Sequence, residues 1–214
     1  NLPNILSQIK WKKSMRWGNN ELYWARPLKS IMCVYNGKKL DFKFFHLQST
    51  NKTYLDKHQE QNFKSFKDFK SYLNFFKKKG ILIDQDERKN FIEKKLLRLT
   101  NLKNLKLFIK DKLLEEVSNI LDRPNVILCS FNQKFLNMPA ELIISTIEYH
   151  QKFFLVYDKT NKLTNNFLIV SDLEDKNNVI KKGNERVVES RLSDAEYFWK
   201  KNKSKNMIKQ VFYL

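Results

Sequence analysis

Near its carboxyl end the chain reads Gly183-Asn184-Glu185-Arg186-Val187-Val188-Glu189-Ser190-Arg191-Leu192-Ser193-Asp194-Ala195-Glu196-Tyr197-Phe198-Trp199. Its apolar residues recur at helical spacing, which predicts a helix with one buried face; they are Val187, Val188, Leu192, Ala195 and Phe198. Gly183 can break a helix. We therefore expect a short helix at about 176–182 and a longer one at about 185–201.

Two arginines in this stretch, Arg186 and Arg191, are candidates for binding an anion. A guanidinium group presents a planar fork of N–H donors that matches a phosphate or a carboxylate. The alternative is a structural role, in which the arginines form a buried network with Glu185 or Asp194.

The rest of the chain predicts an α+β fold with a mixed or antiparallel sheet. Strands are expected at 30–35 and 40–47, joined by an Asn36-Gly37 turn, and again at 126–131, 153–157 and 167–171. Helices are expected at 65–76, 84–99, 111–121 and 139–149. Because the strands cluster around a helical segment and do not alternate regularly with helices, the pattern favours α+β over a doubly wound sheet.

The chain is expected to divide into four parts. These are a strand-rich part of the core at 1–60, a basic helical insertion at 61–122, the second part of the core at 123–201, and a tail or the start of a further domain at 202–214. The first residue is Asn, not Met. We expect the chain to be excised from a longer protein.

The charge is strongly positive and unevenly spread. Lys and Arg number 41 against 23 Asp and Glu, which gives a formal charge of +18. From 61 to 110 there are 14 Lys or Arg and 5 Asp or Glu, so this segment carries +9. Such clustering favours a nucleic-acid partner, and Lys77, Lys78 and Lys79 are the sharpest candidates for phosphate contacts. The alternatives are a lysine-rich composition that reflects an AT-rich genome and, for these three lysines, a solvated helix end.

Two tryptophans, Trp17 and Trp24, flank a Gly-Asn-Asn turn with Arg16 and Arg26 beside them. An exposed Arg–Trp cluster could hold a single-stranded end by stacking and charge, so Arg16, Trp17 and Arg26 are candidate RNA contacts. The alternative is packing of the arginine stems on the rings at the edge of the core.

Several classes of function are excluded by the residues present. Cys33 and Cys129 lie in apolar runs and are expected to be buried thiols in a reducing cytoplasm. The three His residues show no zinc-ligand spacing and no nucleophile motif, and no phosphate-binding glycine loop occurs. We predict no metal site and no catalytic residue in this chain. No apolar run approaches the ~20 residues of a membrane span, so no membrane association is expected.

Four motifs follow one another along the chain: Met15-Arg16-Trp17-Gly18 with Ala25-Arg26-Pro27, Phe131-Asn132-Gln133-Lys134-Phe135-Leu136 with Met138-Pro139-Ala140-Glu141, His150-Gln151-Lys152-Phe153-Phe154, and the stretch quoted first. In this order they resemble the signatures of the bacterial glycyl-tRNA synthetase beta subunit family. The resemblance covers about residues 2–200 and is weak from about 53 to 108. The retained residues of these motifs are where the resemblance implies contacts with the tRNA acceptor arm: Arg16, Arg26, Gln151, Lys152, Arg186 and Arg191.

The resemblance implies a part of the beta subunit of glycine–tRNA ligase. In that family the alpha subunit carries the catalytic core, and the beta subunit supplies tRNA recognition. The implied partners are tRNA(Gly) and the alpha subunit in an alpha2beta2 assembly. ATP and Mg²⁺ are expected at the alpha subunit, and no cofactor is expected in this chain. The matched region is similar to the B3/B4 domain of the phenylalanyl-tRNA synthetase beta subunit.

Two rival functions stay open. Relatives of the B3/B4 domain include hydrolases of mischarged tRNA, and in an editing role His58 or His150 would orient the attacking water. The second rival is a structural scaffold that docks the alpha subunit. One departure matters for the contacts, because this chain has Glu189 where the family tends to have arginine.

Overall fold

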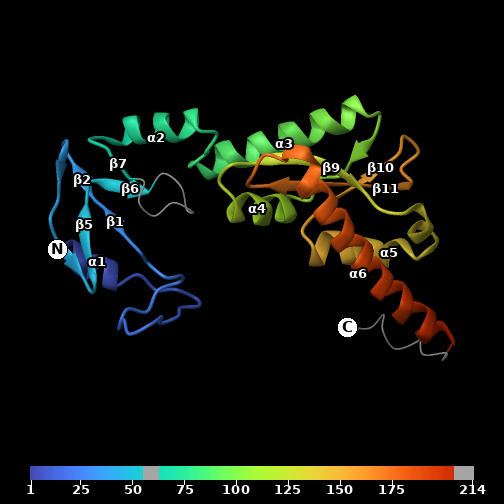
Figure 1. The fold of residues 1–214 in the computed structure, drawn as a ribbon, viewed down its shortest axis with the longest axis horizontal. Helices are drawn as coiled ribbons and strands as arrows, with labels where there is room; N and C mark the ends of the chain where they lie inside the picture. Colours follow the sequence, from blue (N-terminus) through green and yellow to red (C-terminus); the bar gives the residue numbers. More distant parts are fainter. Residues whose placement is uncertain (55–62, 205–214) are drawn as a thin grey trace. The chain divides into compact units, whose positions relative to one another are not determined.

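The computed structural model of the chain describes residues 1–54 and 63–204. It confirms the α+β class, with helices and small mixed or antiparallel sheets (Figure 1). The chain forms two compact units, Asn1–Phe76 and Lys77–Leu214, which are described separately. The subdivision predicted at residues 60, 122 and 201 stays a prediction.

The first unit contains small sheets and short helices. A mixed three-stranded sheet has the order β1, β5, β4, in which β1 pairs in parallel with β5 and β4 pairs antiparallel with it. Two further antiparallel pairs are β2 with β3 and β6 with β7. The elements are α1 (Leu2–Ser7), β1 (Ile31–Met32), β2 (Val34–Tyr35), β3 (Lys38–Lys39), β4 (Lys43–Phe44), β5 (Leu47–Thr50), β6 (Lys52–Tyr54), β7 (Phe63–Ser65) and α2 (Phe69–Lys78), the last of which crosses the boundary at residue 76.

The hairpin turn predicted at Asn36-Gly37 is confirmed, because both residues have positive φ and join β2 to β3. The single strand expected at 40–47 is wrong. The chain there forms β4, turns at Phe45, whose φ is 52°, and returns as β5, with Phe44 opposite Leu47. The sequence pattern did not reveal this second reversal, because Phe is seldom found at positive φ.

The second unit is built on a four-stranded antiparallel sheet with the order β8, β10, β11, β9. Its strands are β8 (Lys106–Leu107), β9 (Asn125–Ser130), β10 (Phe154–Tyr157) and β11 (Leu163–Ser171). Successive side chains of β10 point to opposite faces, so Phe154 and Val156 join one apolar cluster and Leu155 joins the other. The sheet is therefore covered on both faces.

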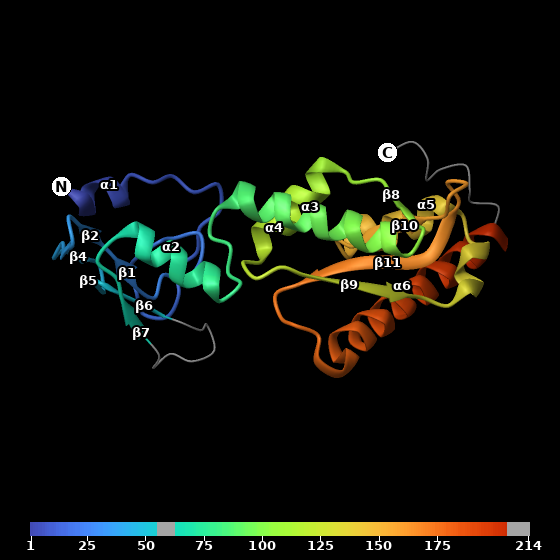
Figure 2. The same cartoon turned by 90° about the horizontal axis from the view of Figure 1, so that it is seen from above.

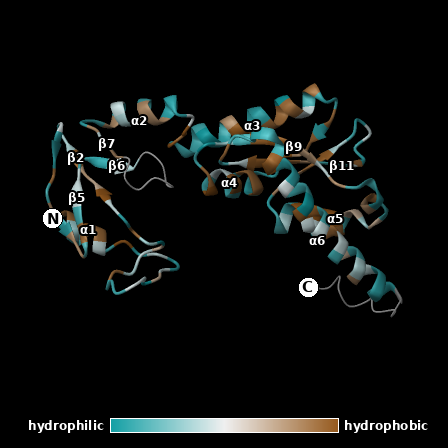
Figure 3. Ribbon diagram, viewed as in Figure 1, coloured by the Kyte–Doolittle hydropathy of each residue, from teal (hydrophilic) through white to brown (hydrophobic). Residues whose placement is uncertain are grey.

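One face of this sheet packs against α3 (Gln85–Leu102) and α4 (Asp111–Ile120) through the fully buried Ile92, Leu96 and Leu114. The other face packs against η1 (Gln133–Asn137), α5 (Ala140–Ile144), the π-helical turn η2 (Ser145–His150) and α6 (Val179–Ser204). Figures 1 and 2 show α3 and α6 on opposite sides of the sheet. Hydrophobic and hydrophilic residues alternate along the helices (Figure 3), and the buried apolar ones pack against the strands. The segment 61–122, predicted as a basic insertion, thus supplies a whole layer and the edge strand β8.

The helix expected at 65–76 lies a few residues later, at Phe69–Lys78, because the Asp68 carboxylate accepts the Ser71 N–H and so caps the helix. The predicted stop is confirmed, since Gly80 has a φ of +76° and its N–H donates to the Lys77 carbonyl. The expected break at Gly183 is wrong. A 3-10 turn, η3 (Lys176–Asn178), leads into α6, which runs without interruption through Gly183.

Physical reasons for this continuity lie at the start of α6. The Asp175 carboxylate accepts the N–H groups of Ile180 and Lys181, which fixes the first turn before the glycine is reached.

Across the described ranges, 1–54 and 63–204, no helix has the length and apolar character to cross a membrane.

Replacing Gly183 with Ala should stabilise the protein by about 0.5–1 kcal/mol, because the site is helical and a Cβ there meets nothing within 4 Å. Gly80→Ala is the matched control and should destabilise by about 1 kcal/mol or more, since its φ is left-handed. Urea unfolding midpoints measure both. Destabilisation by Gly183→Ala would contradict the continuous helix.

Candidate functional site

Helix α6 is fixed to the end of strand β9 by two carboxylates. Glu185 Oε1 accepts the backbone N–H of Ser130 at 2.8 Å and its hydroxyl at 3.3 Å, and Glu189 Oε1 accepts the N–H of Asn132 at 3.1 Å. The two acids are one turn apart, so they bind the strand from one side of the helix. These bonds set the rotation of α6 about its axis.

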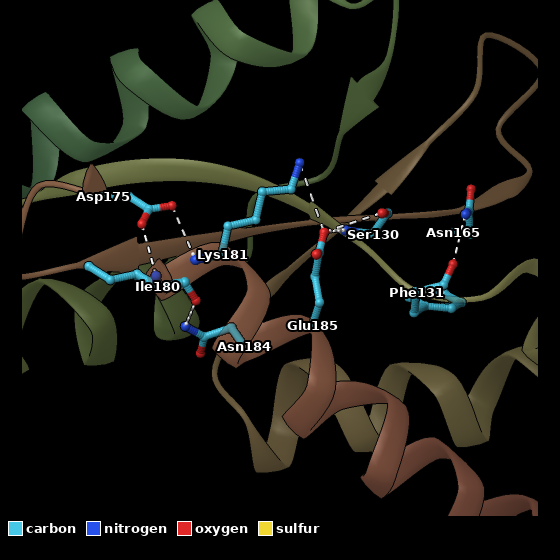
Figure 4. Close-up of polar contacts among 8 residues, drawn as sticks. All are labelled: Ser130, Phe131, Asn165, Asp175, Ile180, Lys181, Asn184 and Glu185. Atoms are coloured by element: carbon cyan, nitrogen blue, oxygen red, sulfur yellow. Dashed lines mark hydrogen bonds and ion pairs between the residues drawn. The ribbon is translucent and has the colours of Figure 1, made fainter. Parts of the chain in front are cut away.

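Neighbouring side chains complete this junction (Figure 4). Asn184 Nδ2 donates to the Ile180 carbonyl at 2.8 Å, and Asn165 Nδ2 donates to the Phe131 carbonyl at 2.8 Å. Lys181 Nζ lies 3.9 Å from Glu185 Oε1. Glu185 of the motif therefore holds the helix in place, whereas Asn184 bonds to a carbonyl within α6 itself.

Arg186 and Arg191 do not form the structural network considered as the alternative for them. Both are exposed, and within the part of the chain that the structure describes neither has a hydrogen-bond or ion-pair partner. Glu185 is engaged by Ser130 and Lys181 instead. Five residues separate the arginines, which is about 140° around a helix, so they point to different sides.

Each arginine lines a different hollow. Arg186 lines one of about 370 Å³ together with the two anchoring acids and Lys182, beside residues 130–132. Arg191 lines one of about 330 Å³ with Thr146, His150 and Gln151. The second hollow brings together two of the predicted contact residues, Gln151 and Arg191, and adds His150, the candidate of the editing alternative.

The wall of the Arg191 hollow comes from η2 and the residue that follows it. Thr146 is buried and donates its hydroxyl to the Leu142 carbonyl at 2.8 Å. His150 ends η2, and Gln151 follows it. π-Helical turns are rare and are often found at functional sites. Thr146 was missed in the sequence, although it lies four residues before His150, a spacing that places helical residues on one side.

Lys152, the neighbour of Gln151, has a different environment. Its backbone has a φ of 60°, and its ammonium group pairs with Glu116 of α4 at 2.5 Å. The hydrogen bond from Lys152 lowers the pKa of the Glu116 carboxyl. Lys152 does not line the hollow that Gln151 and Arg191 share.

Three of the remaining predicted contacts, Arg16, Trp17 and Arg26, belong to the first unit. Trp17 is half-buried, with its ring edge-on to His46 at 6.0 Å, and Arg16 and Arg26 are exposed. Trp24 packs on Trp11 and Phe44. Over residues 1–54 and 63–204, neither arginine makes a cation–π contact with a tryptophan.

The predicted lysine cluster is exposed at the end of α2: Lys77, Lys78 and Lys79. Lys77 Nζ pairs with Glu87 at 2.5 Å, so part of its charge is already neutralised. The contact roles of all these residues stay predictions.

Groups that could supply other chemistry are few. Burial, and secondarily the Glu185 charge, raises the pKa of the Cys129 thiol to about 12, so it stays protonated at neutral pH. Cys33 is half-buried and free. In the described ranges no three His, Cys, Asp or Glu residues gather as metal ligands. His58 lies outside the described residues.

One buried acid was not anticipated from the sequence. Glu148 in η2 is only 5% exposed, and Lys110 pairs with it at 2.5 Å. The hydrogen bond to Glu148 raises the pKa of Lys110. This pair ties η2 to the segment before α4 and so supports the wall of the Arg191 hollow.

Removing the Glu185 carboxylate should destabilise the protein by about 1–3 kcal/mol, because Glu185→Ala leaves the Ser130 N–H without its acceptor. Glu196→Ala on the same helix is the control. It removes only the surface pair with Lys200 and should cost at most about 0.5 kcal/mol. Urea unfolding measures both variants, and equal losses would show that Glu185 does not anchor the helix.

Comparisons with known proteins agree with the motifs. The family described as glycyl-tRNA synthetase beta subunit matches residues 1–214. The chain is 36% identical over 211 residues to the glycine–tRNA ligase beta subunit of Rickettsia akari and 37% identical over 213 residues to that of Rickettsia typhi. Each match covers 96% of this chain and 32% of the relative, so the chain spans about a third of the length of the curated relatives it matches. The chain belongs to the glycyl-tRNA synthetase beta subunit family.

Proposed function

We propose that this chain is the part of a glycine–tRNA ligase beta subunit that contributes to binding of tRNA(Gly) and to assembly with the alpha subunit. The reaction is the ATP-dependent glycylation of tRNA, with its active site, ATP and Mg²⁺ on the alpha subunit of an alpha2beta2 enzyme. Family membership supports this role. The fold proposed for the region is that of the B3/B4 domain of the phenylalanyl-tRNA synthetase beta subunit.

The Arg191 hollow is the observation that carries the proposal. Its lining offers a guanidinium, an amide, an imidazole and a hydroxyl, and no carboxylate is among the lining residues. Arginine binds phosphate oxygens through paired N–H donors, while amide and imidazole groups hydrogen-bond to base edges and riboses. An unpaired nucleotide at the tRNA acceptor end has the chemistry that this set of groups recognises.

The Arg186 hollow is less suited to phosphate. Glu185 and Glu189 line it together with Lys182 and Arg186, so two negative charges face two positive ones. A phosphate placed there would be repelled by the acids at short range. We therefore assign the main RNA contact to Arg191 and a minor one to Arg186.

Arg191→Lys should lower kcat/KM for tRNA(Gly) in glycylation by the reconstituted alpha and beta subunits by roughly 5- to 100-fold, because it keeps the charge but loses the paired donors. Arg186→Lys is the matched control on the same helix and should change kcat/KM by less than about threefold. Both residues are exposed and have no partner in the described part of the chain, so the melting temperatures should not change. Unaltered glycylation by Arg191→Lys would remove the proposed role of this hollow.

An editing-type hydrolase is the second candidate, because His150 shares the hollow with Gln151 and Arg191. A histidine there could orient a water toward the ester of a mischarged tRNA. The assay follows deacylation of mischarged tRNA by the wild-type protein and by His150→Gln. Deacylation that His150→Gln abolishes would support editing, whereas no deacylation above the spontaneous rate excludes it.

Copurification with the alpha subunit distinguishes the scaffold role from the tRNA-binding role. If Arg191 contacts protein, Arg191→Lys or Arg191→Gln weakens recovery of the alpha subunit and leaves tRNA affinity unchanged. If it contacts RNA, the alpha subunit is recovered as for the wild-type chain while tRNA affinity falls.

A further inference from the structure

The carboxyl-terminal half of α3 carries three cations that form no ion pair within the described part of the chain. Lys94, Lys95 and Arg98 are exposed, and among residues 1–54 and 63–204 none has an ion-pair partner. The ammonium group of Lys95 lies 5.4 Å above the Phe91 ring, which is its only interaction given by the described part of the chain.

Other cations of the same basic segment serve the fold. Arg88 donates to the backbone carbonyls of Leu82, Ile83 and Ser118, which ties the start of α3 to α4. Lys89 lies 3.8 Å from Asp111, and Lys77 pairs with Glu87. The positive charges near the amino end of α3 are thus partly balanced by carboxylates and carbonyl groups of the protein. The positive charges toward its carboxyl end are not.

The three free cations border two hollows that meet at Arg98. One, of about 530 Å³, is lined by Lys94, Leu97, Arg98, Asn101 and Leu102. The other, of about 490 Å³, extends from Phe91, Lys95 and Arg98 to the start of β9. Lys94 and Arg98 are one turn apart, about 6 Å along the axis, so their charges form a short row on the helix surface.

The acids near this row do not neutralise it. Glu174 and Asp175 also line the second hollow, but among the described residues neither forms an ion pair with the three cations, and Asp175 is engaged by the N–H groups of Ile180 and Lys181. Lysine is depleted in protein–protein interfaces, while clustered Lys and Arg are typical of surfaces that bind nucleic-acid backbones. Leu97 and Leu102 are exposed and share the first hollow with Lys94 and Arg98, but exposed apolar side chains are common on protein surfaces. The surface therefore favours RNA over an acidic protein.

We infer that the carboxyl-terminal half of α3 binds the sugar–phosphate backbone of RNA through Lys94, Lys95 and Arg98. This inference rests on the proposed tRNA-binding function and assigns it a second contact surface, distinct from the Arg191 hollow. The phosphate oxygens accept hydrogen bonds from the three cations, and each contact releases condensed counterions. The contact recognises the negative charge of the RNA backbone and does not depend on the base sequence.

The experiment measures binding of a tRNA(Gly) transcript by the full chain from 50 to 200 mM salt. The triple variant Lys94→Gln, Lys95→Gln, Arg98→Gln should weaken binding at least about tenfold and reduce the log–log salt slope by about 2, since each lost contact removes about 0.7–0.9. The control variant Lys159→Gln, Lys162→Gln, Lys176→Gln removes the same number of charges from separate exposed positions of the same unit. It should change the slope by less than about 0.5.

A charge-preserving variant, Lys94→Arg, Lys95→Arg, Arg98→Lys, should retain both affinity and slope. If the two Gln triple variants lose tRNA affinity and salt slope equally, the loss reflects net charge alone and the inference is overturned. An unchanged salt slope in the α3 triple variant would also overturn it. Weaker association with the alpha subunit at unchanged tRNA affinity would show a protein-docking surface and also overturn it. If Arg191→Lys impairs glycylation while the α3 triple binds tRNA normally, only the inference fails. If the wild-type chain, alone and with the alpha subunit, binds no tRNA, the proposed function itself fails.

Discussion

The bonds from Glu185 and Glu189 to the end of β9 determine what the surface of α6 can do. They fix the rotation of the helix on the sheet, and the buried Val188 and Leu192 then complete the apolar contact. Once that rotation is set, Arg191 must face η2 while Arg186 faces the strand end. The two acids that anchor the helix also line the Arg186 hollow, so anchoring reduces the capacity of that hollow to hold an anion. The Arg191 hollow, on another side of the helix, has no acid in its lining.

Sequence reasoning succeeded where periodicity and capping agreed. Helix α3 begins after Asp84, whose carboxylate accepts the Glu87 N–H, and its apolar residues repeat at helical spacing, so both its type and its start could be predicted. It failed where a short element depends on distant partners. The two-residue strand β8 exists only because β10 lies beside it, and no local pattern in Lys106–Leu107 marks a strand. At Gly183 intrinsic propensity pointed to a break, but the capping of the first turn and the burial of the later turns outweigh the cost of one glycine, about 1 kcal/mol.

The candidate site also depends on residues that are distant in the sequence. The motifs nominated Gln151 and Arg191 separately, 40 residues apart, and only the folded chain places them in one hollow. Adjacent residues can also diverge: Lys152 follows Gln151, but its left-handed backbone directs its chain toward Glu116 of α4. Residue type and spacing therefore identified the chemistry of the side chains, whereas the folded chain decided which of them form an ion pair within the protein, through the carboxylates that lie within reach.

The positions of the two proposed contact surfaces constrain how one RNA could engage both. The α3 row and the Arg191 hollow belong to layers on opposite faces of the four-stranded sheet (Figure 2). Strand β9 is an edge of this sheet; its start borders the α3 hollow, and its end borders the hollow of Arg186. An RNA that engages both faces through this edge must pass round β9 and the Arg186 hollow, where Glu185 and Glu189 oppose the positive charge of Lys182 and Arg186. A straight duplex lying on one face cannot do this, because bending a stiff helix costs several kcal/mol over a short span. The arrangement is therefore suited to an RNA whose flexible single-stranded end enters the Arg191 hollow while a separate part of its backbone lies along α3.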